Sequence, residues 1–107
     1  MTREGARDNV LASIDGALTT FGDSVRIVVY YELDKLFGVS REDVVLKPEK
    51  LDETINKIFG VGAQVIRKAI FARLEKDSGM KNLASQGLAS AIRAVYHEKI
   101  EKMSWLG

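Results

Sequence analysis

The feature that most constrains the fold is a glycine break, Phe59-Gly60-Val61-Gly62-Ala63, between two amphipathic helical patterns. Apolar residues recur three or four positions apart on both sides of it: Leu51, Ile55 and Ile58 before the break, and Ala63, Ile66, Ile70 and Leu74 after it. This spacing predicts two helices joined by a tight turn. Because glycine tolerates positive φ, we expect one of the two glycines to cap the first helix and the other to free the entry to the second.

The second of these helices carries a wide apolar arc. Val65, Ala69 and Ala72 extend it beyond the stripe that contains Ile66 and Ile70. An arc of this width has to be covered, so we expect other helices to pack around it.

Residues 25–37 are the most apolar part of the chain. The β-branched and aromatic side chains at positions 25 and 27–31 would also suit a buried strand. We favour a helix because Leu33, Leu36 and Phe37 continue the helical period and no breaker precedes Gly38. A helix that is apolar nearly all round is expected at the centre of the fold.

The remaining signals are weaker. Ser40 followed by Asp43 predicts one short helical turn, and Pro48 suits the first position of a helix. A last helical face is formed by Leu88, Ala91, Ile92, Val95 and Tyr96. Residues 103–107 are interpreted as an apolar tail that follows this helix.

Together these patterns predict an all-α fold in which residues 1–107 form one domain. We expect a bundle of four main helices plus a short helical turn, with a glycine-containing helix-turn-helix hairpin at Phe59 to Ala63. The predicted helical ranges lie near residues 3–20, 24–37, 49–59, 62–78 and 86–103.

Two segments of the chain look alike. Residues 21–25 and residues 59–63 both begin with Phe-Gly and open a long apolar helix, with an offset of 38 residues. At that offset Val28 matches Ile66 and Leu36 matches Leu74. A duplicated helical hairpin would produce this pattern, but so would two independent helices that start after a Phe-Gly cap, and we favour the second explanation.

Composition excludes several classes of protein. The chain has no cysteine and one histidine, so disulfides, thiol chemistry and thiolate metal sites are ruled out, and we predict no metal or cofactor. No apolar run approaches the roughly 20 residues of a membrane span. The first residues lack the apolar core of a signal peptide, so we expect a cytoplasmic protein with no membrane partner.

Enzyme-like patterns in the chain lack their structural context. The glycines at 60 and 62 resemble part of a dinucleotide fingerprint, but a helical pattern rather than a strand precedes them. Tyr31 and Lys35 have the spacing of a dehydrogenase pair without the nucleotide-binding unit, and His97 has no second ligand near it in the sequence. We therefore predict no catalytic residues, although the helix that opens at Gly62 could hold an anion at its amides.

Six short motifs resemble a small archaeal family, the Nitrosopumilus output domain 5. They are Tyr30-Tyr31-Glu32-Leu33, Phe37-Gly38, Pro48-Glu49, Ile58-Phe59-Gly60, Gly62-Ala63 and Ile66. The resemblance covers about residues 8–80 and involves structural rather than catalytic positions. It implies a helical module that acts as an output or interaction unit in archaeal signalling. On this basis we predict a non-enzymatic protein-interaction or regulatory module whose protein partner is unknown.

The competing prediction is a DNA-binding regulator. If Gly60 is the turn of a helix-turn-helix motif, the second helix presents Gln64, Arg67 and Lys68 outward as nucleic-acid contacts. The motif's apolar positions are then occupied by Ile55, Phe59, Val61, Ile66 and Ala69. Asn56 stands where a small residue is usual, Gly62 loosens the turn, and the second helix is long for the motif, so nucleic acid is the less favoured partner.

Two further features bear on partners. Residues 1–59 carry a net charge of −3 and residues 60–107 a net charge of +4, which can mark an anionic partner or simply reflect how the surface is filled. Tyr96, Met103, Trp105 and Leu106 place large apolar side chains near the chain end, and these types are enriched at interfaces. We therefore predict a homodimer that pairs through the last helix and tail.

Overall fold

All regular structure in the described residues is helical. The computed structural model describes residues 2–106, with side chains as far as residue 102. Its α-helices are α1 (Arg3–Thr19), α2 (Asp23–Phe37), α3 (Pro48–Phe59), α4 (Ala63–Ser78) and α5 (Leu88–Leu106). Three short 3-10 segments connect them: η1 (Arg41–Asp43), η2 (Gly60–Gly62) and η3 (Leu83–Gln86). The all-α prediction is confirmed, and each of the five predicted ranges is an α-helix, where the expected count of main helices was four.

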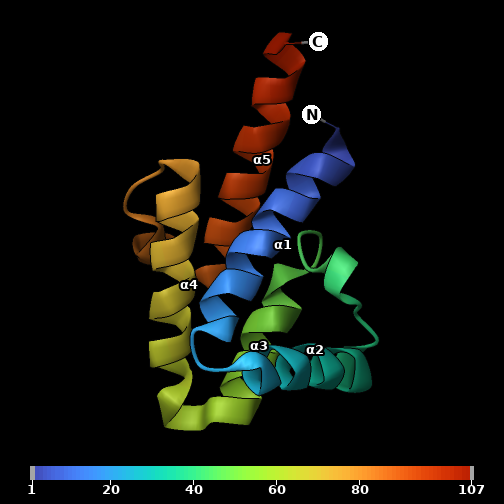
Figure 1. Ribbon diagram of the computed structural model, residues 1–107, viewed down its shortest axis with the longest axis vertical. Helices are drawn as coiled ribbons and strands as arrows, with labels where there is room; N and C mark the ends of the chain where they lie inside the picture. Colours follow the sequence, from blue (N-terminus) through green and yellow to red (C-terminus); the bar gives the residue numbers. More distant parts are fainter. Residues whose placement is uncertain (1, 107) are drawn as a thin grey trace.

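The long helices form a bundle that α2 closes at one end. Helices α1, α4 and α5 pack against one another along the long axis, and α3 packs against α2, α4 and α5. Figure 1 shows α2 lying across the lower end of this bundle, while both chain ends lie at the upper end. The radius of gyration, 13.2 Å, is that of a single folded unit of this length.

One hydrophobic core receives side chains from every α-helix. Its largest fully buried members include Leu11, Ile14 and Leu18 of α1, Leu33 of α2, Leu51 and Ile55 of α3, Ile70 and Leu74 of α4, and Leu88 and Ile92 of α5. The predicted faces of α3, α4 and α5 therefore point inward, as do the buried residues of α1. The wide arc expected on α4 is only partly covered, because Val65 and Ala72 are exposed.

The prediction that residues 24–37 form the central helix is wrong in position, although they are helical. Only Val29 and Leu33 of α2 are buried. Ile27, Val28 and Tyr31 lie on the opposite side of the helix and are exposed. With one side packed on the bundle and the other open, α2 is a peripheral helix.

This placement also bears on the suspected duplication. Val28 and Leu36 of α2 are exposed, whereas their counterparts Ile66 and Leu74 of α4 are buried. Positions that match in sequence thus occupy different environments, which agrees with two independent helices that share a Phe-Gly start.

The glycine hairpin is formed, but its two glycines differ in role. Gly60 caps α3 with φ 53° and ψ −120°, a conformation that L side chains rarely adopt. Gly62 has φ −77° and ψ −9°, which any residue adopts, so the expectation that both glycines need conformational freedom is wrong for Gly62. Pro48 occupies the first turn of α3 and η1 follows Ser40, both as predicted.

The end of the chain also differs from expectation. Residues 103–106, predicted as a tail, continue the backbone of α5 to Leu106. In Figure 1 the last turns of α5 extend past the first turn of α1.

Candidate functional site on the outer face of α2

The most distinctive surface of the molecule is the outer side of α2. Its central residues are Ile27, Val28 and Tyr31, whose exposed fractions are 58%, 43% and 64%. We define the α2 face as the exposed row formed by Asp23, Ser24, Ile27, Val28, Tyr31, Asp34 and Lys35. Members of this row recur three or four positions apart, so they line one side of the helix.

The opposite side of α2 fixes how the helix is turned. Val29 and Leu33 are fully buried in the core, and Tyr30 beside them is partly buried. The Tyr30 hydroxyl donates a 2.6 Å hydrogen bond to Asp15 of α1. Arg41 of η1 donates to the other oxygen of Asp15 through Nε at 3.0 Å and through Nη2 at 2.7 Å. These contacts tie α1, α2 and η1 together and hold Ile27 and Tyr31 toward solvent.

The contacts among Tyr30, Asp15 and Arg41 favour the protonated form of Tyr30. Burial raises the pKa of the Tyr30 hydroxyl far above its ordinary value, and the hydrogen bond to the Asp15 carboxylate raises it further. The same carboxylate raises the pKa of Arg41 through its hydrogen bonds. Tyr30 therefore remains a neutral hydrogen-bond donor at physiological pH.

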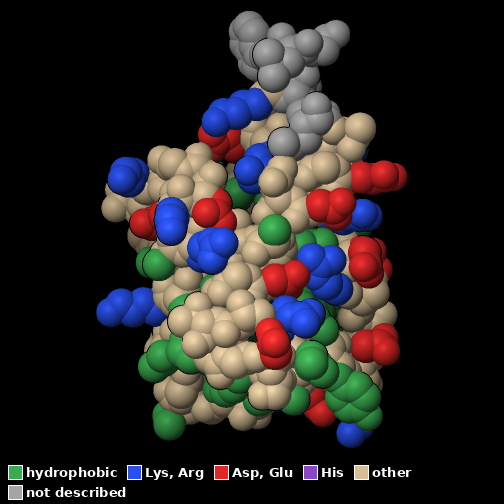
Figure 2. All heavy atoms as spheres, viewed as in Figure 1, with side chains coloured by type: hydrophobic (Ala, Val, Ile, Leu, Met, Phe, Trp, Pro, Cys, Tyr) green, Lys and Arg blue, Asp and Glu red, His purple; other side chains and the backbone are tan. Residues whose placement is uncertain are grey.

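Apolar side chains at this density are costly to leave in water. Burying one side chain of this kind contributes about 1.5–3 kcal/mol relative to full exposure. Figure 2 shows hydrophobic side chains gathered along the lower end of the molecule, where Figure 1 places α2 and the turn into α4. Contiguous apolar surface of this sort typically marks an interaction site.

The predicted nucleic-acid residues lie on α4, next to the glycine hairpin. Gln64 and Lys68 are exposed, as predicted. Arg67 instead folds back on α3, where its Nε donates to Asp52 at 2.6 Å and its Nη2 to Asn56 at 3.3 Å. The exposed row at the start of α4 therefore consists of Gln64, Val65 and Lys68, and the exposed Val61 of η2 precedes it.

Ion pairs within the fold neutralise part of the charge difference between the two halves of the chain. Arg67 and Arg93, from the basic half, form ion pairs with Asp52 and Glu49 of α3, from the acidic half. Such pairs join α4 and α5 to α3, and they leave fewer cations available for an anionic partner.

The residues predicted for self-association all belong to α5. Leu88, Ile92 and Val95 are buried in the bundle, so the face expected to pair with a second chain packs instead on its own core. Tyr96 is half-buried against this core, with its ring edge-on to His97 at a centroid distance of 6.2 Å. The side chains of Met103, Trp105 and Leu106 lie outside the described residues.

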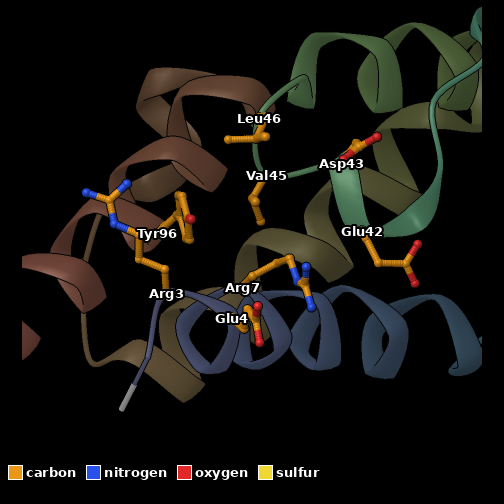
Figure 3. A pocket seen from close by; sticks show the side chains of 8 residues that line it. All are labelled: Arg3, Glu4, Arg7, Glu42, Asp43, Val45, Leu46 and Tyr96. Carbon is orange, nitrogen blue, oxygen red and sulfur yellow. The ribbon is translucent and has the colours of Figure 1, made fainter.

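A shallow pocket of about 200 Å³ lies beside Tyr96 (Figure 3). It is lined by Arg3, Glu4 and Arg7 of α1, Glu42 and Asp43 of η1, Val45 and Leu46 after η1, and Tyr96 of α5. Two arginines and three carboxylates give its rim no single sign of charge, so electrostatics selects neither an anion nor a cation. The pocket is also smaller than most ligand sites, which enclose roughly 300–1,000 Å³.

No other chemical centre emerges from the described part of the chain. Within it, no three His, Asp or Glu side chains are grouped as metal ligands. None of the helices described is both long and apolar enough to cross a membrane. Comparisons with protein-family models, curated proteins and solved structures gave no match. The resemblance to the Nitrosopumilus output domain 5 family therefore stays a prediction.

Proposed function

We propose that this protein is a non-enzymatic interaction module that binds another protein through the α2 face. The observation that carries the proposal is the row of Ile27, Val28 and Tyr31, exposed on a helix whose other side is fixed in the core. A rigid apolar row needs little reordering on binding, which lowers the entropic cost of association.

The chemistry of the face fits a protein partner. Tyr31 presents an aromatic ring with a hydroxyl at its edge, a side-chain type enriched among residues that dominate binding energy. Asp23, Asp34 and Lys35 surround the apolar centre and supply a polar rim. An apolar centre with a charged rim is the usual anatomy of a protein interface.

A capture experiment tests the proposal. Wild-type protein and the variant Tyr31→Asp are used as bait in an extract of the source cells, with Leu46→Asp as the matched control. Leu46 is 63% exposed but lies beside Tyr96, outside the α2 face. We expect a partner that is retained by wild type and Leu46→Asp and lost by Tyr31→Asp. Identical partners for all three baits would overturn the assignment of the α2 face.

DNA binding is the second candidate function, supported by the exposure of Gln64 and Lys68 on α4. Phosphate contacts give any DNA-binding protein a salt-dependent affinity for random duplex. A gel shift at low salt with wild type and Lys68→Glu tests this function. Salt-sensitive binding that Lys68→Glu weakens would favour it, and no shift at micromolar protein would reject it.

The setting that we propose is regulatory. Membership of the archaeal output-domain family would make the partner a component of a signalling pathway in the cytoplasm. The fusion or co-purification of this protein with a sensor or transcription component would support that setting.

A further inference from the structure

We draw no further inference here: the strongest candidate, the apolar surface patch around Ile27, Val28 and Tyr31 on the outer side of α2, already carries the proposed function, and nothing in the described part of the chain shows which kind of partner covers it.

Discussion

Ser13 and Asp77 illustrate how single polar residues orient helices in this fold. The Ser13 side chain is almost fully buried on α1, and its hydroxyl donates a 2.7 Å hydrogen bond to Asp77 near the end of α4. Arg73 donates to the same carboxylate oxygen at 2.9 Å. The Ser13 bond lowers the pKa of Asp77 below its ordinary value of 3.8, with a smaller contribution from Arg73.

We predict that Ser13→Ala costs about 1 kcal/mol of unfolding free energy at neutral pH, the typical net value of such a bond. A lowered carboxyl pKa contributes stability above its unfolded value of 3.8 that is lost as the pH falls through the folded value. The difference between wild type and Ser13→Ala should therefore shrink below that pH. Urea unfolding at neutral pH and at about pH 3 measures it.

Ser90→Ala is the matched control for this experiment. Ser90 is exposed on α5, so its substitution should change stability equally at both pH values. A Ser13→Ala difference that is constant with pH would contradict the assigned hydrogen bond to the ionised carboxylate.

Ile66 and Val65 are adjacent residues of α4 with opposite environments. Ile66 is 5% exposed in the core, whereas Val65 is 59% exposed. We predict that Ile66→Asp costs about 3 kcal/mol or more, because a carboxylate is buried without a partner. Val65→Asp should change stability by less than about 0.5 kcal/mol. Thermal unfolding of both variants tests the core, and similar midpoints for the two would refute it.

At the level of helices and turns, the α3–α4 hairpin depends on one of its two glycines. Gly60 has positive φ, whereas Gly62 has ordinary backbone angles, and a Cβ at Gly62 would meet only Phe59 Cβ at 3.9 Å. We predict that Gly60→Ala costs about 1–3 kcal/mol through backbone strain. Gly62→Ala should be neutral or slightly stabilising, because it reduces the freedom of the unfolded chain. Equal losses in chemical denaturation would contradict this division of roles.

The same hairpin is closed by the ion pair between Arg67 and Asp52. Their side chains are 17% and 37% exposed, so the pair is partly shielded from solvent. We predict that Arg67→Glu costs about 1–2 kcal/mol, because it replaces attraction with repulsion at a partly buried site. Lys68→Glu, at an exposed neighbouring position, should have little effect. If Asp52→Arg fails to rescue Arg67→Glu, the loss does not come from this pair.

The helical patterns in the sequence predicted where the helices lie better than they predicted which side of each helix is buried. The spacing of Leu51, Ile55, Ile66 and Ile70 identified two helices and their buried sides, because each has apolar residues on one side only. In α2 apolar residues occur on both sides, so the period located the helix but not its inner face. The exposed side was still readable, because Asp34 and Lys35 continue the row that contains Ile27 and Tyr31.

The sequence pattern did not predict the contacts between segments that are far apart in the chain. Arg67 lies on the outward side of its helix in an isolated hairpin, but its long side chain reaches Asp52 across the turn. The face of α5 that contains Leu88 and Ile92 is equally suited to a second chain or to its own bundle. The structure shows that α5 packs on α1, α3 and α4 of the same chain, so this face belongs to the bundle.

At the scale of the whole molecule, α5 completes the core and leaves the chain end away from α2. Leu88, Ala91, Ile92 and Val95 are all buried, and α5 contacts α1, α3 and α4. Figure 1 shows the end of α5 and the α2 helix at opposite ends of the bundle. Folding and self-association should therefore respond differently to shortening the chain.

We predict that deletion of residues 88–107 abolishes cooperative unfolding, because it removes one wall of a single core and exposes the buried faces of three helices. Deletion of residues 103–107 removes none of the described core, so it should preserve a cooperative transition. Circular dichroism during heating measures both. The shorter deletion also tests the predicted homodimer: association through Met103, Trp105 and Leu106 is lost in it, whereas binding of a protein partner through the α2 face should survive. If wild type forms a dimer and the shorter deletion is a cooperatively folded monomer, the dimer interface lies in the C-terminal segment.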